Sequence, residues 1–453
     1  MSINFANLDA AQNDVLTNLK NMDKGPANPS TLAIMKKKLS AAKGTLPPIY
    51  QKAIYEPFLA IINKLTEADF AKATYPNSDT VYIIFDIAQA IIQNSEGYEA
   101  DATDAFEEVV SDLYDGFLSA EDRRNIKLPD YEVLPPLVKW GNPDYGPYTL
   151  TSDATATFDV NCAVVNLPPS HAHGALMGWA CLGHETAGHD ILHADEGLLD
   201  EMAKAVKTAI KADKQIKSAS MRDTLALYWS TRMDETASDL MGVLNLGPAA
   251  AAVIIPYFRG LLGSFGMPQK LRSAGDKDDV HPADILRVML GAAAVRLLSF
   301  TDKNAWADTI LSEGLKDMTS IVLNSSSKID QASAQRSADI VAKVVMQTDF
   351  TSLLNHSLQE IQDWADKDEK IVADLRKIVS KPSKAKISKD AYATHVLAAA
   401  VYEGLLVKQD IAPLFKNMIK ILKQMHNNNP SWGPLYILHP GDLRREFIID
   451  FPR

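Results

Sequence analysis

Apolar residues recur every three or four positions along most of this 453-residue chain, as in YQKAIYEPFLAIINKL (50–65) and SDTVYIIFDIAQAIIQ (78–93). Such spacing collects apolar side chains on one face of a helix, and it predicts amphipathic helices that pack around a shared core. Strand-like runs are few. The clearest is FDVNCAVVNLPPS (158–170), where Pro168 and Pro169 end a segment rich in valine. We therefore expect a mainly α fold with a small β element.

The chain is long enough for two or three domains. A connector rich in proline, glycine and tyrosine, LPDYEVLPPLVKWGNPDYGPYTL (128–150), follows the first helical region. We expect a helical N-terminal region (1–150), a catalytic core (151–302) and a helical C-terminal region (303–453). Within the core, the pattern predicts helices over 174–193, 197–213, 220–246, 249–265 and 283–299, with Gly247 and Pro248 ending the third.

Charge and apolar content argue against two classes of partner. The chain carries 46 Lys and Arg against 57 Asp and Glu, a net charge of −11, which is unsuited to binding nucleic acids or anionic membranes. The N-terminus does not look like a signal peptide, and the longest apolar stretch, LGPAAAAVIIPYF (246–258), is too short for a membrane span. Two cysteines, Cys162 and Cys181, cannot build a disulfide framework. We expect a soluble, cytoplasmic protein, whose oligomeric state stays open.

The stretch GHETAGH (183–189) holds two histidines with a glutamate directly after the first. In a regular α-helix, His184 and His189 would point about 140° apart, because they are separated by five residues. They can bind one metal ion only if the helix widens into a π-type turn, and Gly188 weakens the regular helix at a suitable place. A metal site here therefore predicts a bulged helix between the two histidines.

A second stretch, MDETASDLMG (233–242), supplies carboxylates on one face of a later helix. Glu235 and Asp239 are four residues apart, so their side chains lie on the same side. One carboxylate can bind a metal ion, and the other can accept the free ring N–H of a ligand histidine and fix its tautomer. Together, the two stretches predict a metal site built from two helices.

The two motifs resemble those of the gluzincin metallopeptidases. HETAGH (184–189) is similar to the first motif of the dipeptidyl peptidase III family, and ETASD (235–239) is similar to the E-x-x-x-D motif of thermolysin-like peptidases. The resemblance covers these two motifs and no more of the chain. It implies a zincin-like catalytic core that binds one zinc ion. The roles that it implies are zinc ligands at His184, His189 and Glu235, a general base at Glu185, and a carboxylate that orients a ligand histidine at Asp239.

On this resemblance we expect a zinc-dependent metallopeptidase that cuts a peptide or small amide substrate by direct attack of a metal-activated water. The reaction needs a group that stabilises the developing oxyanion. We choose His281, because it follows the third-ligand helix and starts a new element; the other candidates are Tyr228, Tyr257 and Arg287. Alternatively, His281 is part of an ordinary helix cap.

Several alternatives stay open. His189 and His193 have the regular four-residue spacing, and with this pair Asp190 would be the base. The chain could also be a helical binding or scaffold protein with a structural or vestigial metal site, or a metal-dependent hydrolase of a non-peptide amide or ester. Finally, CAVVNLPPSHAHG (162–174) is a candidate edge strand for pairing with an extended substrate, or else an ordinary buried strand.

Overall fold

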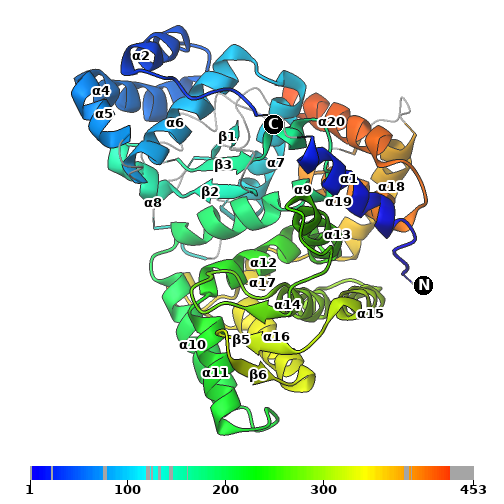
Figure 1. Cartoon of the computed structure of the whole chain (residues 1–453). Coiled ribbons are helices and arrows are strands. Elements are labelled where there is room, and N and C mark those ends of the chain that lie inside the picture. The colour runs from blue at the N-terminus through cyan, green and yellow to red at the C-terminus, as the bar shows by residue number, and fades with distance from the viewer. Residues whose placement is uncertain are drawn as a thin grey trace.

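The computed structural model describes residues 3–21, 24–74, 79–118, 123, 126–130, 134–141, 146–160, 162–381, 387–388 and 390–428. Within these ranges the chain is mainly helical with two small three-stranded sheets, which confirms the expected mainly α fold with a small β element (Figure 1). None of the helices in these ranges is both long enough and apolar enough to cross a membrane. The end of the expected C-terminal region, 429–453, lies outside the described residues.

Helices form most of the N-terminal region, as expected. They are α1 (Leu8–Lys20), α2 (Leu32–Ala41), α3 (Pro48–Tyr50), the π-helix η1 (Gln51–Tyr55), α4 (Glu56–Lys64), α5 (Glu67–Thr74), α6 (Asp79–Glu96) and α7 (Ala100–Leu118). In Figure 1, α2, α4, α5 and α6 lie together at one end of the molecule, beside the first sheet. These helices and the sheet enclose a separate small core that includes Phe58, Ile87 and Val164.

The first sheet has the strand order β1 (Leu137–Trp140), β3 (Val164–Leu167), β2 (Tyr148–Leu150). The central strand, β3, confirms the strand expected within 158–170. All its residues are buried, and it pairs in parallel with β1 and antiparallel with β2. The hypothesis that 162–174 forms an edge strand is therefore wrong, because both sides of β3 are already paired. Instead, the partly exposed β2 is an outer strand of the sheet.

The segment that carries GHETAGH is helical but is not one regular helix. It consists of α9 (Leu176–Trp179), the π-helix η4 (Gly183–Asp190) and the 3-10 helix η5 (Ile191–Ala194), and α10 (Leu198–Ala212) follows as expected. The single helix expected over 220–246 is wrong, because this segment forms two helices, α11 (Ala219–Ser230) and α12 (Met233–Leu246). The break falls at Arg232. Its guanidinium stacks 4.0 Å from the centre of the Tyr228 ring and donates to the carbonyl oxygen of Asp276.

After the Gly247–Pro248 stop, α13 (Pro248–Ser264) and α14 (Asp284–Leu297) confirm the last two helices expected in the core. The other elements are α8 (Ser152–Thr155), η2 (Ala156–Phe158), η3 (Pro169–Ala172), β4 (Ala274–Gly275), α15 (Lys303–Gly314), η6 (Leu315–Asp317), β5 (Ile321–Leu323), β6 (Ser327–Ile329), α16 (Gln331–Gln347), η7 (Thr351–Leu353), α17 (Leu358–Ile361), α18 (Asp366–Ser380), α19 (Ala393–Leu406) and α20 (Ile411–Asn427). The second sheet has the order β4–β5–β6.

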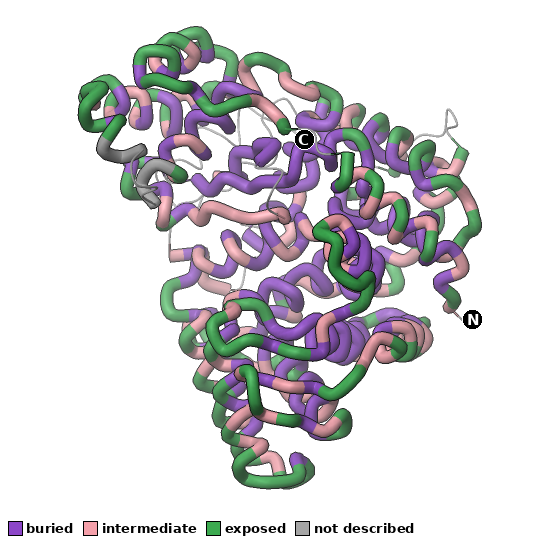
Figure 2. The backbone as a smooth tube through the Cα atoms, viewed as in Figure 1, coloured by how far each residue is buried: buried purple, intermediate pink, exposed green. Residues whose placement is uncertain are grey.

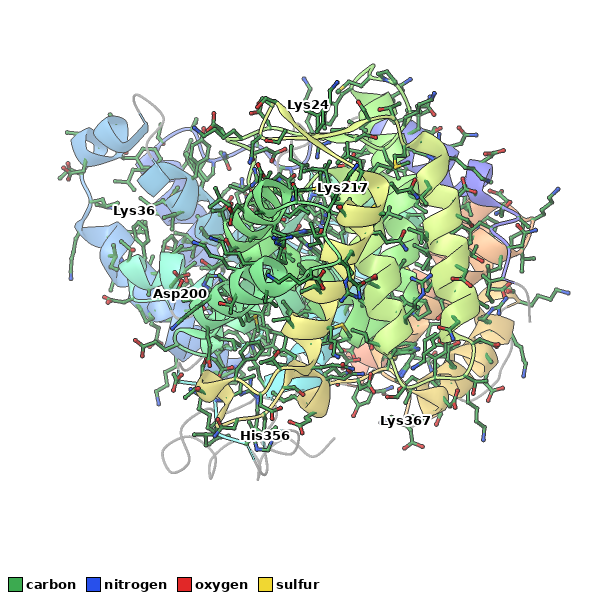
Figure 3. The ribbon with its side chains drawn as sticks, turned by 90° about the horizontal axis from the view of Figure 1, so that it is seen from below. Lys24, Lys36, Asp200, Lys217, His356 and Lys367 are labelled. Atoms are coloured by element: carbon green, nitrogen blue, oxygen red, sulfur yellow. The ribbon has the colours of Figure 1, made fainter. Side chains whose placement is uncertain are left out.

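A larger core draws on residues from α1 to α20. Because α1 packs on α13, α19 and α20, the two ends of the described chain meet on one side of the molecule (Figure 1). Buried backbone segments gather at the centre of the molecule (Figure 2), while charged residues such as Asp200, Lys217 and Lys367 are exposed, Lys367 near the lower edge in Figure 3. Since this core includes all three expected regions, the division at 150 and 302 stays a prediction.

Small residues let η4 and α12 cross at very short range. A Cβ added at Gly188 would overlap the Cα and Cβ of Ser238, and one added at Gly183 would lie 3.1 Å from the Cα of Gly242. Backbone atoms in a packed core cannot move aside as the tip of a flexible side chain can. Glycine at these positions therefore allows the helix with the two histidines to lie directly against the helix that carries Glu235.

We expect Gly188→Ala to lower the free energy of unfolding by about 3 kcal/mol, because the added methyl group overlaps the backbone of α12. Gly242→Ala, on the other helix of the same crossing, is the matched control: its Cβ would meet its nearest neighbour at 3.5 Å, an ordinary contact. Urea unfolding followed by circular dichroism measures both variants. Equally small changes in the two would contradict this close packing.

Candidate metal centre

The π-helix η4 brings the two histidines of GHETAGH together. Its hydrogen bonds join residues five apart, so residues i and i+5 lie on the same face of the helix. The Nε2 atoms of His184 and His189 are separated by 3.1 Å. The bulged helix predicted from the spacing is therefore confirmed.

Glu235 of α12 completes a triangle of donor atoms. Its Oε2 lies 3.3 Å from His184 Nε2, and its Oε1 lies 3.5 Å from His189 Nε2. Ligand atoms bound tetrahedrally to zinc, at about 2.0–2.1 Å from the ion, are separated from one another by about 3.3 Å. The observed separations are close to this value. The three residues predicted as metal ligands are thus brought together in an arrangement that could hold a metal ion.

An aspartate of α12 holds the outer ring nitrogen of each histidine. His184 Nδ1 lies 2.9 Å from Asp239 Oδ1, as predicted, and His189 Nδ1 lies 3.1 Å from Asp234 Oδ2. When each ring carries a single proton, on Nδ1, and this N–H donates a hydrogen bond to an aspartate, the two Nε2 atoms present lone pairs to each other. Two facing lone pairs with the carboxylate of Glu235 beside them form a donor set that fits a zinc ion.

Arg287 of α14 anchors Asp239 from the other side. Its Nε and Nη2 donate to the two carboxylate oxygens at 2.8 and 2.6 Å, and its guanidinium lies 4.9 Å from the centre of the Phe258 ring. Burial opposes ionisation of Asp239, but Arg287 and His184 together hold the pKa of this carboxyl well below its usual range. The chain from Arg287 through Asp239 therefore fixes the orientation of the His184 ring.

The carboxylates also set the protonation of the site. Burial lowers the pKa of His184, but hydrogen bonds to Asp239 and Glu235 outweigh burial and raise this pKa to about 10. Burial likewise opposes ionisation of Glu235, yet its hydrogen bond with His184 lowers the pKa of Glu235 to about 2. A divalent cation that binds here must therefore displace a proton from His184.

Glu185, the expected general base, is buried and is held by the sheet. The hydroxyl of Thr149, on the outer strand β2, lies 3.0 Å from Glu185 Oε2 and 2.9 Å from the Glu185 carbonyl oxygen. Glu185 lines the same cavity as His184. A strand therefore holds the Glu185 carboxylate in the cavity that His184 also lines.

His281 and Tyr257, two of the candidate oxyanion-stabilising residues, line the cavity. His281 Nε2 lies 3.3 Å from Glu235 Oε1, while Asp279 Oδ1 holds His281 Nδ1 at 3.0 Å. Its place is not that of a helix cap, because α14 begins at Asp284 with Ala283 as its N-cap. The hydroxyl of Tyr257, which also lines the cavity, has no hydrogen-bond partner among the described residues.

The other two candidates are engaged elsewhere. Both carboxylate oxygens of Asp239 accept from Arg287. The hydroxyl of Tyr228 accepts the backbone N–H of Ala283 at 2.9 Å. The His281 side chain is about half exposed, whereas the Tyr257 hydroxyl is buried, so the geometry favours His281 among the four candidates as a group that can meet a substrate oxygen.

For the alternative metal pair, His189 and His193, the structure shows no close approach of ring nitrogens like that between His184 and His189. His193 Nε2 lies 3.4 Å from Asp234 Oδ1, so it shares with His189 a carboxylate partner. Asp190 is buried and accepts the backbone N–H of Ser152, and burial raises its pKa to about 7. The π-helical turn removes the regular spacing on which this alternative depends, so the geometry favours His184 with His189.

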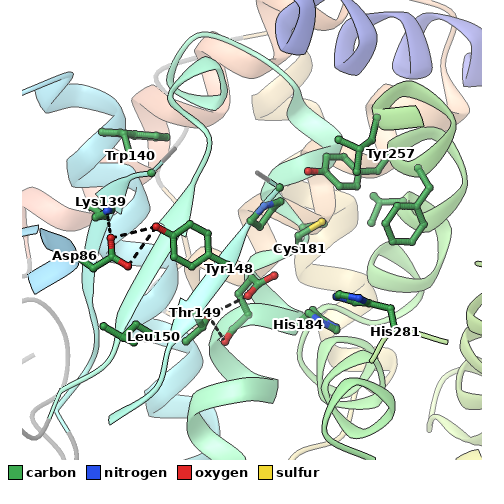
Figure 4. Close-up of a pocket in the computed structure, with 18 of the residues that line it drawn as sticks. Asp86, Lys139, Trp140, Tyr148, Thr149, Leu150, Cys181, His184, Tyr257 and His281 are labelled. Carbon is green, nitrogen blue, oxygen red and sulfur yellow. Dashed lines mark hydrogen bonds and ion pairs between the residues drawn. The ribbon is translucent and has the colours of Figure 1, made fainter. Parts of the chain in front are cut away.

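These side chains line a cavity of about 930 Å³. One wall is a partly exposed apolar stripe formed by α13 and the residue that caps it, which comprises Ala250, Ile254, Phe258, Leu261, Leu262 and Phe265. Helix α6 and strand β2 contribute to the rest of the lining. Figure 4 shows His184 and His281 on one side of Tyr148 and Asp86 with Lys139 on the other. A cavity of this volume suits a small ligand or a short peptide.

Three residues of the site were missed from the sequence. Asp234 directly precedes Glu235, and a carboxylate at this place was a usable signal for a second histidine partner. Asp279 lies two residues before His281, a spacing that permits the observed contact with its backbone N–H. Thr149 had no signal, because its contact with Glu185 depends on how β2 pairs in the sheet.

Comparisons of this chain with protein-family models, with curated proteins and with solved structures found no match. What the site does is therefore inferred from its geometry and from the chemistry of its donor atoms.

One zinc ion should bind per chain, with an affinity that rises with pH. Zinc needs the Nε2 lone pair of His184, whose pKa is raised from 6.5 to about 10 in the metal-free protein. The stability that this proton contributes is fully present below pH 6.5 and is lost as the pH rises through about 10. Between these limits we expect the zinc affinity to increase about tenfold per pH unit, with release of one proton. Titration calorimetry in buffers of different ionisation enthalpy measures both.

The matched variants are Glu235→Gln, which removes a ligand oxygen's charge, and His356→Gln, which alters a histidine that pairs with Glu360. Zinc content should fall only in the first. A pH-independent affinity, or one tightly bound ion in Glu235→Gln, would show that the ion binds elsewhere.

Proposed function

We propose that this chain is a zinc-dependent metallopeptidase with a zincin-like catalytic core. The proposal rests on the ligand triangle of His184, His189 and Glu235: the two Nε2 atoms are 3.1 Å apart, and one Glu235 oxygen lies 3.3 Å from the first while the other lies 3.5 Å from the second. Three protein ligands leave one tetrahedral position open, which is typical of catalytic zinc sites, whereas structural sites use four. This count favours an enzyme over a scaffold with a structural ion.

Each residue around the triangle has a defined task in this proposal. Zinc, when bound, supplies a Lewis acid that lowers the pKa of a water molecule and polarises the carbonyl group of the scissile bond. Glu185 takes the proton of the attacking water and passes it to the leaving amine. Thr149 keeps the Glu185 carboxylate in place. His281, doubly protonated and with Nδ1 held by Asp279, donates from Nε2 to the developing oxyanion.

Two features of the cavity favour a peptide substrate over another amide or an ester. The outer strand β2 borders the cavity, so an extended chain can add to the sheet there through its backbone. The apolar stripe of α13 begins near the ligands, where Gly242 separates Ala250 from the backbone of His184, and it continues to Phe265. Apolar side chains of a bound peptide would gain about 25 cal/mol for each Å² that they bury on this stripe.

Glu185→Gln should retain zinc and lose peptide hydrolysis. The amide of glutamine cannot accept the proton, so we expect kcat to fall by about 10²- to 10⁴-fold. Zinc content should not change, because Glu185 lies outside the ligand triangle. Peptide-library digestion followed by mass spectrometry measures the activity, and metal analysis measures the zinc. Glu196→Gln, at an exposed glutamate beyond the site helices, is the control and should behave as the wild type.

Each contrary result identifies a different failure. Wild-type activity in Glu185→Gln would exclude Glu185 as the base. Zinc-dependent hydrolysis of esters or small amides without any peptide cleavage would favour the non-peptide hydrolase. Purified protein that takes up no stoichiometric zinc would favour the scaffold.

A further inference from the structure

The cavity continues to the face of the first sheet that lies opposite Glu185. The register pairs both Lys139 of β1 and Tyr148 of β2 with Asn166 of β3, so these residues form one row across the sheet. Side chains in one row project from one face, and those of the next row project from the other face. Thr149 belongs to the next row and meets Glu185. The cavity is lined by residues from both rows, and it therefore passes around the outer strand β2.

Lys139 forms a buried ion pair with Asp86 of α6 at this second end of the cavity (Figure 4). Lys139 is 6% exposed and Asp86 is 7% exposed, yet both line the cavity. The hydroxyl of Tyr148 lies 3.2 and 3.3 Å from the two carboxylate oxygens of Asp86. An ion pair removed from water to this extent adds little net stability. Its position in a cavity wall is better explained by a ligand.

In this ion pair, Lys139 is the residue with N–H donors that have no acceptor among the described residues. An ammonium group has three N–H donors. In the part of the chain that the structure describes, Asp86 is the one acceptor that Lys139 meets. Asp86, in contrast, already faces Lys139 and the hydroxyl of Tyr148. Lys24, exposed at the same cavity, adds a further positive charge. Surplus donors and surplus positive charge favour an anionic acceptor.

We propose that Lys139 binds the C-terminal carboxylate of a peptide substrate. This inference rests on the proposed peptidase function. The cavity joins Lys139 to Glu185 around β2, so a peptide whose carboxylate meets Lys139 presents to Glu185 a bond upstream of its own C-terminus.

Pairs of peptides with one sequence, ending either in a free carboxylate or in an amide, test the proposal. The wild type should cleave the free acid with a kcat/KM about 10- to 100-fold above that for the amide, since the acid makes a charge-assisted contact with Lys139. The double variant Asp86→Asn/Lys139→Met removes both charges and leaves neither buried alone. It should lose this preference, because its activity on the free acid falls to the level of its activity on the amide.

The matched control is Lys38→Met/Glu96→Gln, which removes an exposed ion pair that links α2 to α6 away from the cavity. It should keep the wild-type preference. Binding gives a readout that needs no turnover: zinc-loaded Glu185→Gln should bind the fluorescent free acid about 10- to 100-fold more tightly than the amide, measured by anisotropy.

Equal treatment of acid and amide by the wild type, or a preference that survives in the double variant, would overturn the role of Lys139. If acetylation of the peptide's N-terminus lowers kcat/KM and amidation of its C-terminus does not, the recognised group is the N-terminal ammonium and its partner is Asp86. This result would also overturn the role of Lys139. If the wild type cleaves neither peptide, the peptidase proposal fails, while the binding comparison still decides whether Lys139 recognises a carboxylate.

Discussion

The short distance between η4 and α12 is the constraint on which the metal centre depends. Gly188 faces Ser238 where a methyl group has no room. At this separation, Glu235 lies within 3.5 Å of both histidine rings, and the aspartates before and after it on α12 meet the outer ring nitrogens. A bulkier residue at the crossing would move all of these contacts apart together, because every carboxylate partner of the two histidines comes from the same helix.

The local part of this arrangement could be predicted because it depends on spacing along one element. His189 is the fifth residue after His184, which is the hydrogen-bonding interval of a π-helix, so a shared metal ion required the bulge that η4 contains. Helical periodicity alone placed Glu235 and Asp239 on one face of α12. The mainly α fold and the buried strand within 158–170 likewise follow from short runs of sequence.

Contacts between distant segments could not be predicted in this way. At the break before α12, Arg232 donates to the backbone of Asp276, and no glycine or proline marks this break. The burial of β3 between two strands follows from pairing with β1 and β2, both of which lie in or beside a connector rich in proline. The same pairings bring Thr149 to Glu185 and place Lys139 in the cavity, so the residues that surround the reaction site were harder to predict than the ligands.

The charge balance explains why a divalent cation suits this centre. Although burial opposes their ionisation, contacts with the histidines, and for Asp239 also with Arg287, hold the pKa values of Asp234, Glu235 and Asp239 below their usual ranges. Three ionised carboxylates therefore face one permanent cation, Arg287. In the metal-free protein the proton on His184 offsets part of this excess, which is why its pKa is raised to about 10. A divalent ion supplies positive charge in place of this proton and takes the ring nitrogens as its ligands. The carboxylates are then offset by a charge that does not itself titrate.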